Sequence, residues 1–375
     1  MNPAKTIIVT GANGFIGSYL VQALLKRHWT VHALGRSKGG VPWPERVLAA
    51  VRAAGAPGEP PDLSRLQGHE ADLARPDLGL AKTPALFGES EAVLVHLAGD
   101  TRFVPPDPAV QHEANVDGTL NVVRALRRFV SRVVHVSTAY VAGDRAGMIL
   151  ENETDVGQGF HNHYEKTKLE AEIAVRSLCG ELHLPLAIAR PSIIVNDTVN
   201  GRSSAFTHLN VLVEMANRVQ EFYGIKDGEV VNRAIRVPVN PSARPNIAAV
   251  DPIAEALVLI AESPSSAGKT FHLCHPSPQS NAEIFGLVLE AFGIEGKISL
   301  NFVQKMQRPL TRTEEMVVRA FRVYLPYLNY NGTFDCSNTR ELIPDYDGLF
   351  KPADIDYLRK VIAFERADRS RSAAR

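Results

Sequence analysis

The chain has 375 residues, of which 45 % are hydrophobic, and its 41 basic residues balance 41 acidic ones. A chain of this length can bury a sizeable core, and it suggests two domains or one large domain with an appendage. Equal charges give no electrostatic reason to expect a nucleic acid or an anionic membrane as partner. No run of about 18 apolar residues is present to span a bilayer, and no secretory signal is visible. The composition therefore indicates a globular enzyme or binding protein.

The cysteine usage bears on cellular compartment and metal binding. Cys179, Cys274 and Cys336 lie far apart in the sequence, with neither a CxxC pair nor a histidine cluster at metal-ligand spacing. This pattern argues against a disulfide framework and favours a reducing compartment such as the cytoplasm. We therefore expect no metal site.

The first 195 residues alternate short runs rich in Val, Ile and Leu with helical patterns. Continuous apolar runs are typical of strands that are covered on both faces of a parallel sheet. The alternation predicts an α/β fold with a Rossmann-type doubly wound parallel sheet, whose ligands bind at the carboxyl ends of the strands. Strands are predicted at 6–10, 30–34, 93–98, 133–137 and 186–189, and helices at 16–27, 45–54, 109–129 and 164–179.

The alternation of strand and helix patterns stops after residue 195, where turn residues interrupt it, and it resumes near residue 246. A helix at 253–262 and a strand at 270–274 follow, and the spacing of Ser280 and Glu283 predicts a capping box before a later helix. The predicted organisation is an NAD(P)-binding Rossmann core at 1–195, a substrate-lobe insertion at 196–245, a return to the core at 246–275, a mostly helical C-terminal substrate lobe at 276–365 and a disordered tail at 366–375.

The segment Thr10–Gly17 follows the first predicted strand and opens the first predicted helix. Its GxxGxxG spacing meets the demands of a dinucleotide loop, which are a tight turn, close backbone approach to a pyrophosphate and close packing of helix on sheet. The helix N-terminal amides would then face the phosphates. An ordinary strand–helix turn is the alternative interpretation. The cofactor contacts predicted from this loop are Gly11, Asn13, Gly14, Phe15, Ile16 and Gly17.

The residue after the second predicted strand bears on the choice of cofactor. A site that prefers NAD usually places an acidic residue there for the ribose hydroxyls, but this chain has Arg36. A guanidinium suits a 2′-phosphate, so we predict NADP(H), with NAD(H) as the alternative. Asp72 and Leu73, after the third strand position, would suit the adenine edge.

Tyr164 and Lys168 are four residues apart in a predicted helix and therefore share one helical face. A neighbouring ammonium favours the phenolate, which predicts a lowered phenol pKa suited to acid–base work. Ser137 and Thr138 end the preceding predicted strand and should bring a hydroxyl to the same edge of the sheet. The hydroxyl, the phenol, the lysine and the glycine loop occur in order within one α/β frame, and we do not expect chance to produce all four together.

Over most of residues 5–290 the sequence resembles the extended short-chain dehydrogenases/reductases. The resemblance implies a catalytic triad, here Thr138, Tyr164 and Lys168, with the lysine also holding the nicotinamide ribose. The further cofactor contacts that the resemblance implies are Leu97, Ala98 and Gly99 along the cofactor and Pro191, Ser192 and Ile193 at its nicotinamide end.

Finer motifs resemble the thioester-reductase and fatty acyl-CoA reductase branch, whose NAD-binding domain is of the male-sterility type. They are the segments Ala71–Leu80, Val136–Val141 and Pro191–Ile194, the last followed by Gly201. Arg202 departs from the branch, which often has an aromatic residue there. The resemblance implies NADPH-dependent reduction of an acyl thioester, bound to CoA or to a carrier protein and preformed elsewhere, to an aldehyde or alcohol.

Other functions stay open at this point. A nucleotide-sugar epimerase or dehydratase shares the fold, although Ala139 and Tyr140 stand where a dehydratase is expected to place acids. A dehydrogenase acting on a ketone or alcohol is a second alternative, and a non-catalytic NAD(P)-sensing protein is a third. Asp100–Arg102, at the predicted crevice mouth, suit either substrate contact or structural hydrogen bonding. The oligomeric state is open, and a homodimer through the helices near Tyr164 rests on analogy alone.

Overall fold

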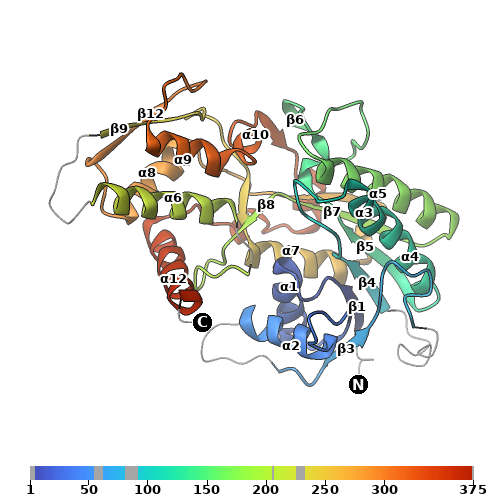
Figure 1. The fold of residues 1–375 in the computed structure, drawn as a ribbon. Coiled ribbons are helices and arrows are strands. Elements are labelled where there is room, and N and C mark those ends of the chain that lie inside the picture. Colours follow the sequence, from blue (N-terminus) through green and yellow to red (C-terminus); the bar gives the residue numbers. More distant parts are fainter. Residues whose placement is uncertain (1–4, 55–61, 81–91, 205–206, 225–232, 374–375) are drawn as a thin grey trace. The chain divides into compact units, whose positions relative to one another are not determined.

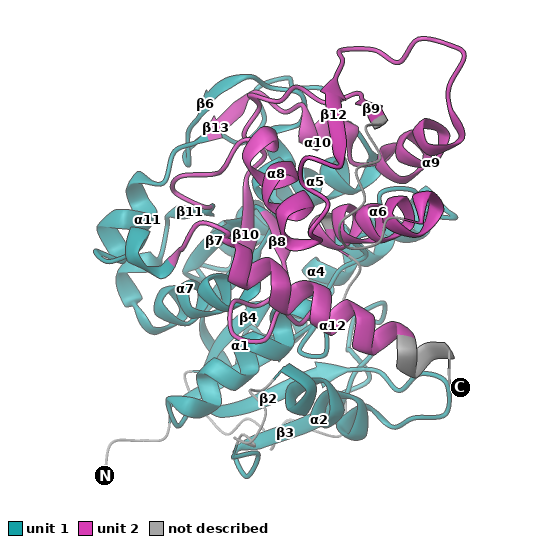
Figure 2. Ribbon diagram, turned by 90° about the vertical axis from the view of Figure 1, so that its left-hand side faces the viewer, with its two compact units in different colours: residues 1–192, 250–274, 334–349 teal, residues 193–249, 275–333, 350–375 magenta. Residues whose placement is uncertain are grey.

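The computed structural model describes residues 5–54, 62–80, 92–204, 207–224 and 233–373. These residues form two compact units, which Figure 2 shows in different colours. Unit 1 comprises residues 1–192, 250–274 and 334–349, and unit 2 comprises residues 193–249, 275–333 and 350–375.

Unit 1 contains the glycine loop and the predicted catalytic residues. Its strands are β1 (Thr6–Thr10), β2 (Thr30–Gly35), β3 (Leu66–Glu70), β4 (Ala92–His96), β5 (Val130–Val136), β6 (Gly147–Ile149), β7 (Leu186–Pro191) and β11 (Thr270–Leu273). Its helices are α1 (Phe15–Lys26), α2 (Trp43–Ala54), α3 (Pro108–His112), α4 (Gly118–Leu126), α5 (His163–Glu181), α7 (Val250–Glu262) and α11 (Ser337–Leu342).

The seven-stranded sheet of unit 1 has the order β11-β7-β5-β4-β1-β2-β3, and all its pairings are parallel. From β1 the chain moves to β2 and β3 on one side and then returns to β4 on the other. Because parallel crossovers are right-handed, α1 and α2 lie on one face and α4 and α5 on the opposite face (Figure 1). This confirms the predicted doubly wound α/β fold, and it puts the topological switch point between β1 and β4.

The central strands are buried on both faces, which explains their continuous apolar sequences. Ile7, Ile8 and Val9 of β1 are fully buried, and all five predicted strands of the first 195 residues are present within a few residues. The edge strand β3 was not predicted, because its residues are mostly half-buried and include Gln67, His69 and Glu70. An edge strand needs no apolar run, so the sequence carried no signal for it.

The predicted continuous helix at 109–129 is wrong in detail. α3 ends at His112, a π-helical turn covers Glu113–Asp117, and α4 ends at Leu126. A π turn inserts extra backbone into a helix and is often found at functional sites. Here it turns Asn115 into the buried interior, where Asn115 is 1 % exposed.

Unit 2 combines short parallel strand pairs with helices around an apolar core. β8 pairs with β10, and β9 pairs with β12. Its strands are β8 (Ile193–Val195), β9 (Arg233–Val237), β10 (Ile247–Ala249) and β12 (Ile298–Phe302), and its helices are α6 (His208–Tyr223), α8 (Asn281–Ala291), α9 (Arg312–Phe321), α10 (Leu325–Leu328) and α12 (Ile355–Ala373). The capping box predicted at Ser280 and Glu283 is confirmed at the start of α8.

The division of the chain differs from the predicted one in two places. Residues 334–349, which the sequence assigned to the C-terminal lobe, belong to unit 1. There the Thr339 hydroxyl lies 2.7 Å from the Glu151 carboxylate, and the Tyr346 hydroxyl donates to the carbonyl of Cys274 at 2.8 Å. Helix α12 continues to Ala373, where a disordered tail was expected from residue 366. The strand β13 (Gly332–Phe334) lies at the boundary between the units.

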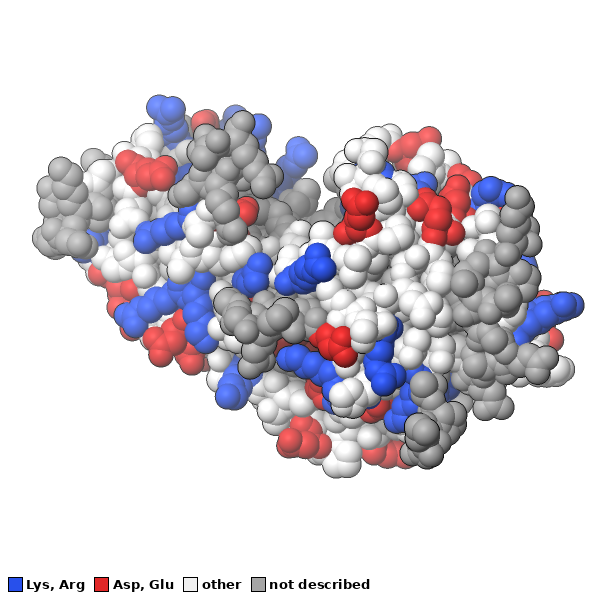
Figure 3. Space-filling view, turned by 90° about the horizontal axis from the view of Figure 1, so that it is seen from below, with Lys and Arg blue, Asp and Glu red and all other residues white. Residues whose placement is uncertain are grey.

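The surface carries charges of both signs. On the face drawn in Figure 3, Lys and Arg side chains are interspersed with Asp and Glu side chains. Among the helices that the structure describes, none is long and apolar enough to cross a membrane.

Candidate active site

The glycine loop approaches the neighbouring backbone so closely that two of its positions exclude a side chain. Gly11 has φ +71°, and a Cβ atom there would lie 2.8 Å from the amide nitrogen of Ala98. A Cβ on Gly17 would lie 2.1 Å from the Gly11 carbonyl oxygen. α1 begins directly after Gly14 without a side-chain cap, so its first amides are available to an anion. The geometry fits the predicted pyrophosphate cradle.

A cavity of about 620 Å³ opens beside this loop in unit 1. Its volume is within the range typical of ligand sites, roughly 300–1,000 Å³. Of the predicted cofactor residues, those that line the cavity are Gly11, Asn13, Arg36, Asp72, Leu73, Ala98 and Gly99. The predicted residues of unit 1 that are not among its lining are Gly14, Phe15, Ile16, Gly17, Leu97, Lys168, Pro191 and Ser192. Ile193 begins unit 2.

One corner of the cavity, after β2, is basic. The Arg36 guanidinium is exposed and lies 4.0 Å from the Asp72 carboxylate. Arg46 donates to the Arg36 carbonyl and stacks 5.8 Å from the centre of the Trp43 ring. Lys38 also lines the cavity. Lys38 and Arg46 were not predicted, although two further cations within ten residues of Arg36 are a signal visible in the sequence.

Glu70, the acidic residue at the end of β3, is hydrogen-bonded to the loop after β2 and not to the basic side chains of this corner. The carboxylate of Glu70 accepts hydrogen bonds from the backbone nitrogen and the hydroxyl of Ser37, each at 2.7 Å. These bonds lower the pKa of Glu70. The acid is therefore engaged by the β2 loop, and it also stabilises the turn from which Arg36 projects.

Thr138 and Tyr164 are brought together at the carboxyl end of β5. Thr138 caps the short 3-10 turn Ala139–Ala142, its hydroxyl accepting from the Tyr140 nitrogen at 3.3 Å and donating to the Pro191 carbonyl at 3.4 Å. Burial raises the pKa of Tyr164 to about 12, and a hydrogen bond with the Thr138 side chain opposes this rise. The predicted lowering of the phenol pKa is therefore wrong in this structure, because burial outweighs the polar neighbours.

Lys168 is 5 % exposed, and its ammonium donates to the Val136 carbonyl at 2.8 Å. Burial lowers the pKa of Lys168 to about 8, and the charge of Glu172 opposes the shift. At neutral pH the site therefore holds a protonated phenol, a hydroxyl and an ammonium on neighbouring elements. Such donors can stabilise negative charge that develops on a carbonyl oxygen and can deliver a proton to it.

Asn115, in the π-helical turn, fixes the loop that follows β4. Its side-chain oxygen accepts from the Asp100 nitrogen at 2.6 Å, and its amide nitrogen donates to the Asp100 carbonyl at 3.0 Å. The same amide nitrogen lies 2.9 Å from the hydroxyl of Thr167, the residue before Lys168. One side chain thus connects the β4 loop, which lines the cavity, to the helix that carries Tyr164 and Lys168.

A buried chain of hydrogen bonds runs beneath the site through His96. The hydroxyl of Thr119 donates to the Asn115 carbonyl at 2.6 Å, so it accepts from Nε2 of His96 at 3.0 Å. Nδ1 of His96 therefore accepts from the Thr10 hydroxyl at 2.7 Å. Burial lowers the pKa of His96 to about 3, so the ring is neutral. The chain joins the strand before the glycine loop to the π-helical turn.

The residues predicted to hold the nicotinamide end lie at the end of β7. Pro191 closes that strand and accepts the bond from Thr138, and the Ser192 nitrogen donates to the Leu273 carbonyl of β11 at 3.0 Å. Within the described residues, no group of three or more His, Cys, Asp or Glu side chains is arranged to hold a metal ion.

Comparison with known proteins gives a family match over most of unit 1. The model of the family described as Male sterility protein matches residues 9–244. The nonribosomal peptide synthetase asaC of Aspergillus flavus is 25 % identical over 94 % of this chain and 36 % of its own length. The aldehyde reductase lnaA of the same organism is 22 % identical over 96 % of this chain and 36 % of its own length. The chain thus spans about a third of the length of these two curated relatives.

Solved structures show the same fold across nearly the whole chain. The terminal R domain from the myxalamid PKS-NRPS biosynthetic pathway has a TM-score of 0.75 at 20 % identity, covering 98 % of this chain and 92 % of that one. A thiolation-reductase di-domain from an archaeal non-ribosomal peptide synthetase has a TM-score of 0.72 at 16 % identity, with 98 % and 91 % covered. The UDP-glucuronic acid 4-epimerase from Bacillus cereus in complex with NAD reaches 0.65 at 19 % identity, with 96 % of each chain covered.

Proposed function

Because this chain belongs to the male sterility protein family, within the extended short-chain dehydrogenases/reductases, we propose that it is an NADPH-dependent reductase of acyl thioesters. The thioester would be bound to CoA or to a carrier protein, and the product would be an aldehyde or an alcohol. The observation that carries the proposal is that Thr138 interacts with the Tyr164 side chain, one helical turn before buried Lys168, in the same unit as a cavity of about 620 Å³.

The residues present fit a dinucleotide. Gly11 and Gly17 let the loop pack closely, because a Cβ on Gly11 would meet the backbone of Leu97 and Ala98 and a Cβ on Gly17 would meet the Gly11 carbonyl. The amides at the start of α1 suit the charge of a pyrophosphate. Arg36, Lys38 and Arg46 would hold the 2′-phosphate of NADP(H), because guanidinium and ammonium groups pair well with phosphate. When bound, the reduced cofactor supplies a hydride to the carbonyl carbon of the substrate.

The chain's own residues would stabilise the oxyanion that forms on the carbonyl oxygen. Tyr164 stays protonated at neutral pH because burial raises its pKa to about 12, so its hydroxyl and that of Thr138 can both donate to this oxygen. The proton of Tyr164 moves to the oxyanion, giving a hemithioacetal. Collapse of the hemithioacetal breaks the carbon–sulfur bond and releases a thiol and an aldehyde. The charge of Lys168 stabilises the phenolate that remains.

The relatives support a thioester substrate. Three of the similar proteins are, by name, a nonribosomal peptide synthetase, a terminal R domain of a PKS-NRPS pathway and a thiolation-reductase di-domain of a non-ribosomal peptide synthetase. Such assembly proteins hold acyl groups as thioesters, and we infer that the substrate here is delivered in the same form. We also infer a reducing compartment such as the cytoplasm, because Cys179, Cys274 and Cys336 are all free and buried.

The test is oxidation of NADPH, followed by absorbance, with acyl-CoA and acyl-phosphopantetheine as substrates and Tyr164→Phe as the inactive control. We expect thioester-dependent oxidation that is lost in the variant. If neither thioester oxidises NADPH while a ketone or a UDP-sugar is turned over, the thioester proposal is wrong and one of the other short-chain dehydrogenase functions holds.

A further inference from the structure

Arg102 lies in the loop after β4 and lines the 620 Å³ cavity together with Gly11 and Asn13. β1 and β4 are parallel neighbours, with Thr10 paired to His96. The glycine loop and the β4 loop therefore leave the sheet side by side, and their contact is tight enough that a Cβ on Gly11 would meet the Ala98 backbone. The loop that carries Arg102 is thus a direct neighbour of the loop that fits a pyrophosphate.

The backbone around Arg102 is held in place, while its side chain is exposed. Nε2 of Gln111 donates to the Arg102 carbonyl at 2.7 Å and to the Asp100 carbonyl at 3.2 Å, and Asn115 holds the Asp100 backbone from the same side. The Arg102 side chain is 55 % exposed. A fixed backbone with a solvent-exposed guanidinium allows the side chain to change partners without a change in the loop.

The present partner of Arg102 is the carboxylate of Asp100. Nε of Arg102 donates to both carboxylate oxygens, at 2.9 and 3.0 Å, and Nη2 donates to one of them as well. These bonds lower the pKa of Asp100, so the carboxylate is ionised at neutral pH. The side chain of Asp100 is only 14 % exposed, and a bidentate guanidinium–carboxylate pair of this kind has the same geometry as a guanidinium–phosphate pair.

The charges around the cavity are divided between two ends. Arg36, Lys38 and Arg46 all follow β2, at the corner suited to the 2′-phosphate. Among the described lining residues, Arg102 is the cation that comes from the β4 side, next to the glycine loop. NADP(H) carries negative charge on its 2′-phosphate and on its pyrophosphate, so we expect a cation near each of these groups.

We propose that Arg102 binds the pyrophosphate of the nicotinamide cofactor by exchanging the Asp100 carboxylate for a phosphate, with Asp100 acting as a built-in competitor. The proposal rests on the cofactor part of the proposed function and is independent of which substrate is reduced. It predicts opposite effects for the two partners. Loss of Arg102 weakens cofactor binding, whereas loss of the Asp100 charge strengthens it, because the guanidinium is released and a nearby negative charge is removed.

The test measures dissociation constants without any substrate, from the quenching of tryptophan fluorescence, since Trp43 lines the cavity. The variants are Arg102→Met and Asp100→Asn. The matched controls are Arg75→Met and Asp77→Asn, because Arg75 and Asp77 form a similar exposed pair two residues apart, at 3.2 Å, and are not among the lining residues. The ligands are NADPH, which has the pyrophosphate and the 2′-phosphate, and 2′-AMP, which has the 2′-phosphate alone. Circular dichroism checks that each variant is folded.

We expect Arg102→Met to weaken NADPH binding about tenfold, which corresponds to about 1.4 kcal/mol, and to leave 2′-AMP binding unchanged. Asp100→Asn should tighten NADPH binding, and the two controls should match the wild type. Unchanged NADPH binding in Arg102→Met would overturn the proposal. If that variant instead raised only the KM for a CoA thioester, the proposal would also be wrong, because Arg102 would then bind a phosphate of the substrate and not of the cofactor. Equal weakening of NADPH and 2′-AMP would overturn it as well, because Arg102 would then serve the 2′-phosphate.

Discussion

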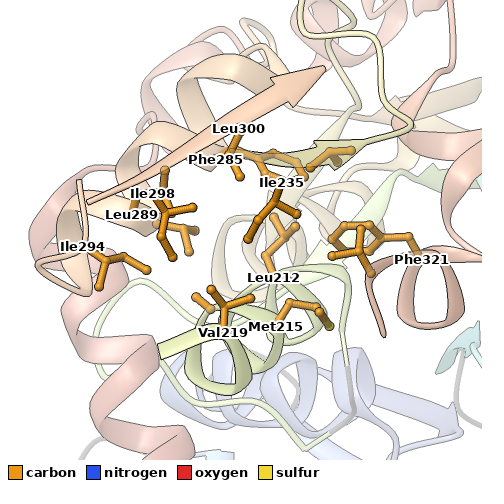
Figure 4. Close-up of a pocket in the computed structure, with 14 residues that line it drawn as sticks. Leu212, Met215, Val219, Ile235, Phe285, Leu289, Ile294, Ile298, Leu300 and Phe321 are labelled. Atoms are coloured by element: carbon orange, nitrogen blue, oxygen red, sulfur yellow. The ribbon is translucent and has the colours of Figure 1, made fainter. Parts of the chain in front are cut away.

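The two units each enclose a cavity, and the two cavities differ in kind. The cavity of unit 1 measures about 620 Å³, and its lining mixes glycines and charged residues with apolar residues such as Leu34 and Trp43. The cavity of unit 2 measures about 50 Å³ and is lined only by apolar side chains, among them Leu212, Phe285 and Phe321 (Figure 4). The first has the size and polarity of a ligand site, whereas the second is a packing gap in a hydrophobic core.

The contrast shows where functional information lies in this chain. The residues of unit 1 that form the candidate site are mostly small, polar or charged, and they stand either in loops after strands or, like Tyr164 and Lys168, on α5. The residues around the unit 2 cavity are interchangeable hydrophobic residues whose common task is burial. We therefore expect substitutions of the polar groups at the candidate site of unit 1 to change chemistry more than stability, and substitutions in the apolar core of unit 2 to do the reverse.

The largest effect is expected for Tyr164→Phe, which removes the hydroxyl proposed to donate the proton. Loss of a general acid typically costs about 10²–10⁴-fold in rate, so we expect kcat/KM with a thioester to fall about a thousandfold while the dissociation constant for NADPH is retained. Tyr223→Phe is the matched control, because its hydroxyl bonds to Thr313 within unit 2 at 2.8 Å. A Tyr164→Phe enzyme with activity near that of the control would contradict the assigned role.

In unit 2, Phe321→Ala should reduce stability rather than chemistry. Phe321 is 2 % exposed and lines the apolar cavity, and a buried Phe→Ala change typically costs about 3–5 kcal/mol of unfolding free energy. We expect a lower midpoint in urea unfolding, and an unchanged dissociation constant for NADPH where the protein is folded. Weaker NADPH binding by the folded variant would show that the apolar core of unit 2 is not separate from the cofactor site.

The buried hydrogen-bond chain of unit 1 should be sensitive to Thr119→Val, which is close to isosteric. The variant leaves Nε2–H of His96 without its acceptor, and an unsatisfied buried donor costs about 1–3 kcal/mol. We therefore expect a loss of stability in that range by urea unfolding. Thr167→Val is a useful comparison, because it removes the bond from Asn115 and the bond to the Tyr164 carbonyl but leaves His96 with both of its partners. A neutral Thr119→Val would mean that His96 finds another partner and that the chain is not continuous.

The pH dependence should report on Lys168. Its ammonium is protonated below the folded pKa of about 8 and neutral above it, whereas Tyr164, with a pKa of about 12, stays protonated throughout. Because the charge of Lys168 stabilises the phenolate, we expect kcat/KM to fall as pH rises through about 8. Lys168→Arg keeps the charge at every pH and should remove this fall from the profile. A wild-type profile that is flat from pH 7 to 9 would refute the role given to the lysine charge.

Much of unit 1 was predictable from two signals. Strands that are buried on both faces have continuous apolar sequences, and the glycine motif comes directly after the first of these strands in the sequence. The edge strand β3 and the π-helical turn at Glu113–Asp117 were not predictable, since an edge strand needs no apolar run and the turn depends on where Asn115 finds partners. α6 was missed because its capping box, Thr207 with Asn210, lies in a stretch crowded with turn residues.

The candidate site shows a similar division. The order of hydroxyl, phenol and lysine along the chain indicated which residues meet, and Thr138 and Tyr164 do meet. The direction of the Tyr164 pKa shift could not be predicted, because it depends on how deeply the ring is buried rather than on its spacing from Lys168. Arg46 was missed because its contribution depends on the stacking of its guanidinium on Trp43.

The most direct test of the account follows the transferred hydrogen. The protein is incubated with an acyl thioester and NADPH that carries two deuterium atoms at C4 of its nicotinamide, and the products are analysed by mass spectrometry. The account predicts a free thiol and an aldehyde with one deuterium on its carbonyl carbon, or an alcohol with two if reduction continues, and neither product with Tyr164→Phe. A product that is the free acid without deuterium, or an unchanged thioester, would contradict it.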